Sequence, residues 1–181
     1  MIPLGYLAKR VPRQRPDWLQ APNVNNIYSV SDCVNDTLAD YCNGWKHNGF
    51  WMFDSVADIQ TAAVANEIDM QDAKLFFYEA YESEFDGDDR PPISPEAPFE
   101  TQVSIPPIKH LEGFDVVTFC DGPNSHSPLS CNGVAADIKT NQHCLLESLD
   151  EAFAAIEGDA FDQCEPGPYR IYAVYSVPWP D

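Results

Sequence analysis

The sequence predicts an α+β protein made of two tandem pseudo-repeated units, each a mostly antiparallel sheet with one or two helices. Three observations predict this class. Short apolar runs typical of strands alternate with helical stretches. Landmarks of the first half recur in the same order in the second half, at offsets of 89 to 94 residues. A content of 44% hydrophobic and 12% aromatic residues is sufficient for a packed core.

The boundary between the units follows a break in composition. Residues 87–98 combine a glycine, four prolines and several acids, which excludes a helix or a central strand there. We interpret this stretch as a stiff, exposed linker. It separates a first unit at residues 1–86 from a second unit at residues 99–181.

The chain opens with a basic segment. Residues 1–15 contain four basic residues and no acid, whereas the other 166 residues sum to 6 − 29 = −23. The four are Lys9, Arg10, Arg13 and Arg15. Residues 5–11 are typical of a first strand that the following prolines end. We expect a solvated basic arm or an edge strand protected by charge; the alternative is an arm that lies on the acidic body or clamps a second subunit as a homodimer.

Two elements are expected between this segment and residue 46. Residues 27–30 are typical of a short strand, and Ser31 or Asp32 can cap a following helix. Apolar side chains then recur at steps of four, three and four, which predicts one face of a helix. They are Val34, Leu38, Tyr41 and Trp45.

The rest of the first unit repeats this alternation. Residues 50–53 are a brief apolar strand candidate. Ser55 and Asp58 form a capping box in front of an alanine-rich helix that runs to about residue 66. The aromatic run at residues 75–82 predicts a strand that is buried on both faces at its start.

The second unit has the same order of elements. A strand is predicted at residues 114–119, and one glycine and two prolines make residues 121–130 largely loop. Ser148 caps a second helix, because Glu151 completes its capping box. A last strand is predicted at residues 171–175.

The formal net charge of −19 limits the possible partners. It excludes most nucleic-acid-binding proteins, since phosphate binding depends on Lys and Arg side chains. No window approaches the ~20 apolar residues of a membrane span, and the first residues lack a secretion-signal pattern, so we expect a cytoplasmic protein.

The densest acidic run is the candidate partner-binding surface. Six acids occur within eleven residues, with no basic residue before Arg90. They are Glu79, Glu82, Glu84, Asp86, Asp88 and Asp89. Complementary charge accelerates encounter with a basic partner, as in immunity proteins and inhibitors that imitate nucleic acid. A solubilising face is the alternative interpretation of the same run.

A small-molecule-binding protein or enzyme is the alternative function. Its ligand would occupy a cleft between the two pseudo-repeats, near the strands at 75–82 and 169–177. The residues placed in that possible cleft are Trp51, Tyr78, His143 and Tyr172, with Glu79 as the acid. No known catalytic fingerprint is present, so no catalytic residue is assigned and the chain is expected to be a non-enzymatic binder.

The six cysteines are expected to be free thiols in a reducing compartment, and neither a metal nor a cofactor is expected. The matched pairs Cys33/Cys42 and Cys120/Cys131 are spaced nine and eleven residues apart, whereas zinc chelation uses shorter spacings. We expect each pair to pack in the core of its own half. His126 is interpreted as an exposed turn residue.

One stretch resembles a known family. Residues Asp40 to Gly44 together with His47, Gly49, Trp51 and Asp54 resemble a Tyr-Asn-x-Gly…His-Gly…Trp-x-Asp segment of ArdA-type antirestriction proteins, over fifteen residues and with a shifted glycine spacing. The resemblance implies an acidic DNA mimic built of small repeated units.

Overall fold

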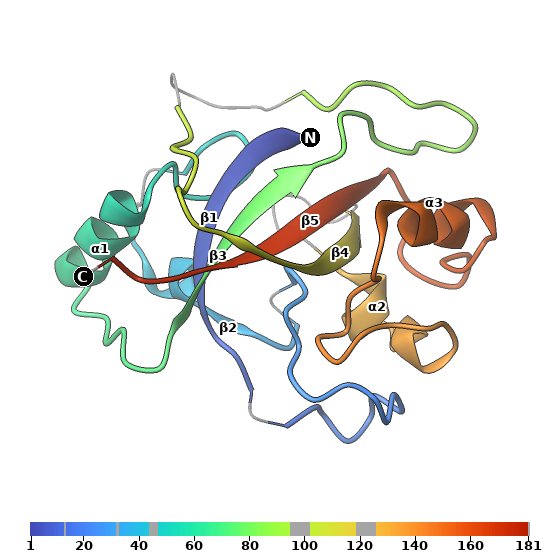
Figure 1. Ribbon diagram of the computed structural model, residues 1–181, viewed down its shortest axis with the longest axis horizontal. Coiled ribbons are helices and arrows are strands. Elements are labelled where there is room, and N and C mark those ends of the chain that lie inside the picture. Colours follow the sequence, from blue (N-terminus) through green and yellow to red (C-terminus); the bar gives the residue numbers. More distant parts are fainter. Residues whose placement is uncertain (13, 32, 44–46, 95–101, 119–125, 181) are drawn as a thin grey trace.

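The computed structural model describes residues 1–12, 14–31, 33–43, 47–94, 102–118 and 126–180. Its centre is one curled antiparallel sheet of five strands in the order β2-β1-β3-β5-β4 (Figure 1). The strands are β1 (Ile2–Arg10), β2 (Asp36–Thr37), β3 (Lys74–Ala80), β4 (His110–Thr118) and β5 (Tyr169–Val177). The α+β class and the antiparallel pairing are therefore confirmed.

Strands from both predicted units belong to this one sheet. β3 of the first half pairs with β5 of the second half, with Phe77 opposite Tyr175 and Tyr78 opposite Val174. β1 extends the sheet beyond β3, and β4 extends it beyond β5. The halves are thus joined edge to edge through their inner strands.

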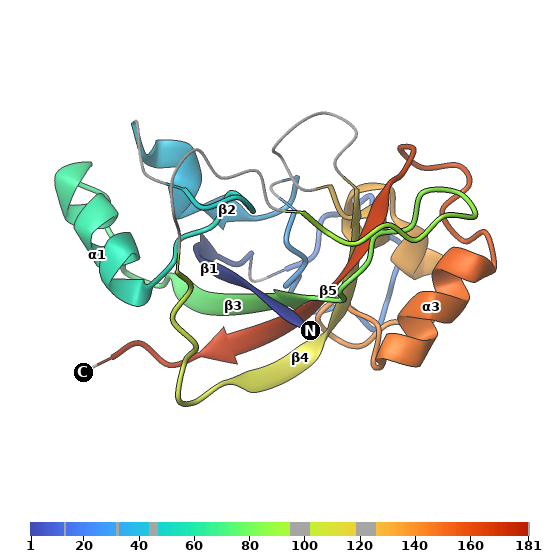
Figure 2. The same ribbon diagram turned by 90° about the horizontal axis from the view of Figure 1, so that it is seen from above.

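Two capped helices lie at opposite ends of the sheet (Figure 2). α1 (Val56–Ala65) begins after Ser55, whose hydroxyl accepts a hydrogen bond from the Asp58 amide at 3.2 Å. α3 (Leu149–Glu157) begins after Ser148, whose hydroxyl accepts one from the Glu151 amide at 3.1 Å. Both helices and both caps were predicted from the capping boxes. The described residues also contain three single-turn elements: η1 (Leu38–Tyr41), α2 (Pro128–Cys131) and η2 (Val134–Ala136).

The core explains why β3 is apolar without alternation. Leu75 and Phe77 pack in a cluster with Ile59 of α1, whereas Phe76 and Tyr78 pack in a second cluster on the other face. Successive strand residues point to opposite faces, so β3 is buried on both sides, as its sequence predicts.

The basic amino-terminal segment is not a solvent-exposed arm. Its residues form β1, which lies between β2 and β3 inside the sheet. Lys9 is completely buried and donates to the carbonyl oxygens of Ser29 (3.0 Å) and Val30 (2.6 Å). The two-residue strand β2 forms the sheet edge beside Lys9 and Arg10, and β4 forms the opposite edge. Arg13 lies outside the described residues.

Two predicted elements of the first half are wrong. Residues 27–30 are buried but irregular. Side chains supply both partners of Val30, whose amide donates to Asp115 and whose carbonyl accepts from Lys9, and the Tyr28 amide donates to the His143 carbonyl. The helix predicted over 33–46 is replaced by β2 and η1, and Tyr41 of its expected apolar face is 52% exposed. Asp32 and Trp45 lie outside the described residues.

The structure tests only parts of the predictions at residues 50–53, 87–98 and 121–130. Of residues 50–53, only Phe53 bridges a strand, opposite Tyr6 of β1. The described part of the predicted loop 121–130 ends in the single turn α2. Of the predicted linker, residues 87–93 belong to an irregular hairpin, and residues 95–98 lie outside the described residues.

Two loops share one hydrogen-bond pattern. In the first Asn loop (residues 48–53), Asn48 donates to the Leu4 carbonyl at 2.7 Å, and its side-chain oxygen accepts from two amides of the loop. In the second Asn loop (residues 141–146), Asn141 donates to the Glu112 carbonyl at 2.7 Å and likewise accepts from two loop amides. Each loop closes on a strand beside a glycine of positive φ, Gly5 or Gly113.

Candidate functional site

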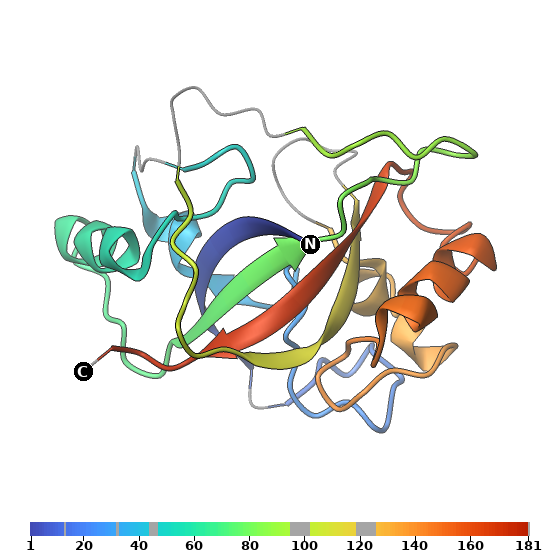
Figure 3. The same ribbon diagram turned by 45° about the horizontal axis from the view of Figure 1, so that its top comes forward.

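The acidic hairpin, defined as residues 82–93, projects from the end of β3 (Figure 3). Its base is fixed to β5, since the amides of Phe85 and Tyr169 each donate to the other's carbonyl oxygen, at 2.8 and 2.9 Å. Its tip is a tight turn in which Asp86 and Asp89 exchange backbone hydrogen bonds of 3.1 Å. Gly87 supplies the positive φ of 59° that such a turn requires.

The structure divides the six predicted partner-binding acids into two groups. Glu79 pairs with Lys109 at 2.5 Å, and Glu84 pairs with Arg170 at 2.8 Å; both carboxylates are largely shielded from solvent. Within the described ranges no ion pair reaches the other four, which are exposed on the acidic hairpin. They are Glu82, Asp86, Asp88 and Asp89.

A groove separates the hairpin from α3. It has a volume of about 450 Å³ and is lined by residues of the hairpin, of the end of α3 and of β5. Its lining is Phe85, Gly87, Asp88, Arg90, Ile156, Glu157, Asp159 and Tyr169. We call it the hairpin–α3 groove. Carboxylates therefore stand beside aromatic and aliphatic surface in one concavity.

Arg90 already occupies part of this groove. Its guanidinium lies over the Phe85 ring, 4.9 Å from the centroid, and donates to the Glu157 carboxylate at 2.5 Å. A cation stacked on an aromatic face and paired with a carboxylate is a common mode of arginine recognition. The groove thus has the chemistry to hold a guanidinium, and Asp88 and Asp159 stand beside it.

The four residues of the possible cleft are not brought together at one accessible surface. Tyr78 and Tyr172 are completely buried in the same core cluster, and burial raises the pKa of Tyr172 far above its usual range. His143 stacks on Tyr28 at 4.0 Å, and burial lowers its pKa although Glu112 opposes the shift. Trp51 is 43% exposed. A ligand could reach both tyrosines only if the sheet core opened.

A buried polar network joins the two halves beneath this core. Asp115 of β4 is fully buried and accepts hydrogen bonds from the Ser127 hydroxyl (2.6 Å) and the Val30 amide (2.8 Å). Desolvation raises the pKa of Asp115 to about 6, although these hydrogen bonds and nearby Lys9 favour the ionised form. The network has no opening to solvent at Asp115, so we assign it to folding.

Two cysteines are not the free thiols that the sequence predicts. Cys33 and Cys131 form a disulfide between the halves, with Cα atoms 5.9 Å apart. His126 lies against this pair, with Nδ1 3.6 Å from the Cys33 sulfur. Cys42, Cys144 and Cys164 are free, and burial raises the pKa of each. Cys120 lies outside the described residues.

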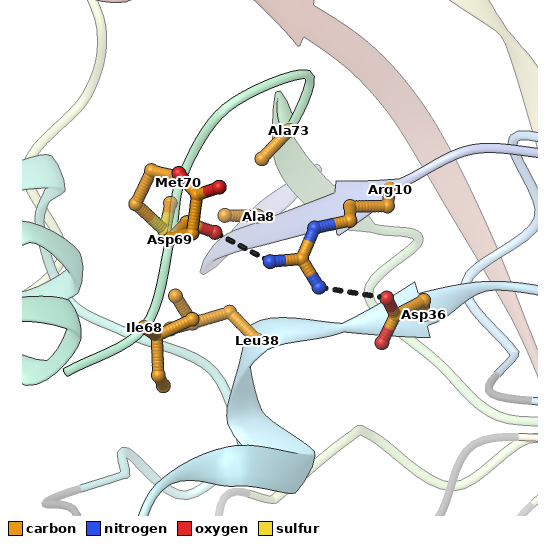
Figure 4. A pocket seen from close by; sticks show the side chains of 8 residues that line it. All are labelled: Ala8, Arg10, Asp36, Leu38, Ile68, Asp69, Met70 and Ala73. Carbon is orange, nitrogen blue, oxygen red and sulfur yellow. Dashed lines mark hydrogen bonds and ion pairs between the residues drawn. The ribbon is translucent and has the colours of Figure 1, made fainter. Parts of the chain in front are cut away.

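The cavity beside Arg10 offers no room for a ligand. Its lining comes from β1, β2 and the residues after α1, and it holds about 10 Å³ (Figure 4). Arg10 fills it by bonding Asp36 at 2.9 Å and the Asp69 carbonyl. This basic side chain is therefore paired within its own chain.

Sequence reasoning did not assign a site role to four residues that matter here. Glu157 and Asp159 stand just after the second predicted helix, but only the fold brings them beside the acidic hairpin. His126 and Cys131 are separated by four residues, a spacing within the range of chelating pairs, so that signal was present in the sequence.

Comparison with known proteins adds no relative. No family model, no curated protein and no solved structure matches this chain. Among the described helices, none has the length and apolar character needed to cross a membrane. The functional argument therefore depends on the geometry described above.

Proposed function

We propose that this chain is a non-enzymatic acidic binding protein that docks a basic protein partner in the hairpin–α3 groove and thereby inhibits or regulates it. The carboxylates would take the place of nucleic-acid phosphates, or of another anionic ligand, on the basic surface of that partner. Direct nucleic-acid binding is not part of the proposal, because the net charge is −19.

One observation carries the proposal: the guanidinium of Arg90 is held between Phe85 and Glu157 in the groove. A lysine or arginine of a partner would meet the carboxylates of Asp88 and Asp159, which line the same groove. Asp86 and Asp89 at the exposed turn extend the negative field outward, where it accelerates encounter. The aromatic and aliphatic floor supplies the apolar contact that an interface core needs.

The proposed inhibitor also accounts for the unequal roles of the six acids. Glu79 and Glu84 are paired and shielded, which suits them to fixing the end of β3 and the base of the hairpin. The acids at the tip are exposed, so their desolvation penalty arises only when a partner binds. We therefore assign partner contact to Glu82, Asp86, Asp88 and Asp89, together with Glu157 and Asp159.

We also propose that the two halves are pseudo-repeats. The support is the matched order of a Gly-bearing strand, an Asn loop, a Ser-capped helix and an inner strand in each half. Asn48 and Asn141 stand at an offset of 93 residues, as do Ser55 and Ser148. On this proposal, the hairpin–α3 groove lies where the end of the first unit and the linker meet α3 and β5 of the second unit.

A binding experiment with a defined probe tests the proposed docking site. A fluorescein-labelled arginine-rich peptide is titrated with the chain, and anisotropy gives the dissociation constant over a series of salt concentrations. The groove variant D88N/D89N/D159N and the control variant E67Q/D69N/D72N each change the net charge from −19 to −16. The control acids are exposed and lie beyond α1, at the other end of the sheet.

We expect the groove variant to weaken binding at low salt at least tenfold and the control variant at most twofold. Equal weakening by the two variants would mean that the peptide senses only net charge, and the groove would lose its role. The natural partner can then be sought by affinity capture with graded salt elution, using the groove variant as the negative control.

A homodimer through the basic segment stays a prediction that sedimentation at low and high salt can test.

A further inference from the structure

We infer that the reduced protein binds one zinc-type divalent metal ion through Cys33, Cys131 and His126, at a site separate from the hairpin–α3 groove. The sulfur atoms and a ring nitrogen of these three residues lie within 4.8 Å of one another. Two thiolates and one imidazole are a preferred ligand set for Zn²⁺, with the fourth position left to water.

The distance from His126 to Cys33 already fits a metal site. The His126 Nδ1 atom lies 3.6 Å from the Cys33 sulfur. In a tetrahedral site with Zn–S of about 2.3 Å and Zn–N of about 2.0 Å, the sulfur–nitrogen edge is about 3.5 Å. The imidazole therefore needs little movement to become a ligand.

The two sulfurs need only the rearrangement that reduction allows. As a disulfide they cannot bind a metal as thiolates, so the site exists in the dithiol form of the chain. In a tetrahedral zinc site the sulfur–sulfur edge is about 3.8 Å, close to the van der Waals separation of two thiols. The Cα atoms are 5.9 Å apart, so rotation about the side-chain bonds can reach that separation.

A second, independent observation is the fixed orientation of His126. Its Nε2 atom lies 3.0 Å from a Glu165 carboxylate oxygen and 3.2 Å from the Asn132 side-chain oxygen. Its backbone is also fixed, because it exchanges hydrogen bonds of 2.9 and 3.0 Å with Thr118 at the end of β4. The Nε2 hydrogen bond goes to the Asn132 amide oxygen, and the Glu165 carboxylate adds a negative charge nearby. A metal-binding imidazole typically gives its remaining N–H to an oxygen acceptor in this way, which leaves Nδ1 aimed at the metal.

The sulfurs are also supported from behind. Ser31 is 1% exposed, and its hydroxyl lies 2.8 Å from the Cys131 sulfur and 3.1 Å from the Cys33 sulfur. A buried hydroxyl can donate to a metal-bound thiolate and stabilise its charge. Glu165 and the strongly acidic chain favour a cation at this place.

The test uses the full-length chain, reduced with a phosphine under anaerobic conditions and titrated with Co²⁺ alone. We expect one Co²⁺ per chain, with sulfur-to-cobalt charge-transfer absorption and intense visible bands of a tetrahedral ion, both lost when Zn²⁺ is added. C33S and C131S should abolish the charge-transfer band. H126A should weaken binding at least tenfold, and E165Q only about threefold, because Glu165 contributes a nearby negative charge and is not a ligand.

The matched control removes two cysteines elsewhere. C42S/C164S should keep the stoichiometry and the spectrum, since neither thiol belongs to the cluster. The oxidised chain should bind no Co²⁺ with thiolate character. Circular dichroism in the reduced state shows whether each variant is folded, and H126A keeps both cysteines should a cysteine variant unfold. Absence of a stoichiometric thiolate–cobalt signal in the reduced chain, or its survival in folded C33S, would leave a disulfide only and overturn the proposal.

Discussion

The two Asn loops have the same backbone hydrogen bonds but opposite surroundings. In the first loop, the residue of left-handed conformation is Trp51, which is 43% exposed and stacks on His47 at 3.6 Å. In the second, it is Cys144, which is completely buried and whose pKa burial raises to about 12.

The difference comes from what covers each loop. Residues 25–28 lie on the second loop, where Asn25 and Asn26 donate to the Gln142 carbonyl and Tyr28 donates to the His143 carbonyl. The exposed Trp51 shows that the first loop is open to solvent at the matching position. The loop shape is thus fixed by its asparagine and a nearby strand glycine, whereas the side chain at the left-handed position is fixed by its neighbours. The following predictions test whether the backbone contacts of the two loops are equivalent although their surroundings differ.

The largest effect is expected from adding a methyl group to the strand glycines. A Cβ on Gly5 would lie 2.6 Å from the Phe53 carbonyl oxygen, and one on Gly113 would lie 2.7 Å from that of Leu146. Both positions also have positive φ. We expect G5A and G113A each to lower the free energy of unfolding by on the order of 4 kcal/mol, as measured by urea denaturation.

Gly87 is the matched control for this prediction. It has a φ of 59°, but a Cβ there meets nothing within 4 Å. G87A should therefore lower the free energy of unfolding by only about 1 kcal/mol, through backbone conformation alone. If G5A or G113A were as mild as G87A, close approach of loop and strand would not be what holds the Asn loops in place.

The next effect concerns the asparagines themselves. N48A removes a hydrogen bond to the Leu4 carbonyl and leaves the amides of Phe50 and Met52 without their acceptor. N141A does the same in the second loop. Because buried unsatisfied amides cost about 1–3 kcal/mol each, we expect each variant to lose about 3 kcal/mol of stability in urea denaturation. A loss confined to one of the two loops would contradict the equivalence of their backbones.

The next prediction concerns pH and a feature of the second half alone, the buried acid Asp115 of β4. Its pKa is raised from 3.8 to about 6, so the stability it contributes is complete below pH 3.8 and is lost as the pH rises through 6. Relative to D115N, the wild-type chain should lose on the order of 2–3 kcal/mol of unfolding free energy between pH 4 and pH 7. The measurement is urea denaturation of both proteins across this range. If the difference in unfolding free energy between the two proteins did not change with pH, the raised pKa of Asp115 would be contradicted.

The smallest effect is expected from the helix caps. Ser55 and Ser148 each accept one amide hydrogen bond at the start of a helix, at 3.2 and 3.1 Å. S55A and S148A should each lower the free energy of unfolding by about 1 kcal/mol, as for other serine caps. Thermal unfolding followed by circular dichroism is sufficient to compare the two. Clearly unequal losses of unfolding free energy would show that the two serine caps are not equivalent.

The predictable part of the fold is the part that local signals determine. The capping boxes at Ser55 and Ser148 predicted both long helices, and the aromatic run after Lys74 predicted β3. The segment at 27–30 was predicted as a short strand, but Val30 finds its hydrogen-bond partners in the side chains of Lys9 and Asp115 instead of a neighbouring strand. No local pattern reports a partner that distant in sequence.

Only the hairpin side of the candidate site could be predicted from the sequence. The exposed acids at 82–89 were recognised as a charged run, whereas their neighbours Glu157 and Asp159 depend on how α3 meets the hairpin. The strand predicted at residues 5–11 is present as β1, but the basic segment is not a solvated arm, because Lys9 finds buried carbonyl partners that its sequence context does not reveal. Long-range pairing, rather than propensity, decided both outcomes.

The proposed binding of a cationic partner in the hairpin–α3 groove can be observed residue by residue. A ¹⁵N-labelled chain is titrated with an arginine-rich peptide and followed amide by amide in two-dimensional NMR spectra. Binding in the groove predicts salt-sensitive shifts concentrated at residues 85–90, 156–159 and 169. Shifts spread evenly over all exposed acids, or centred on residues 67–72, would contradict it.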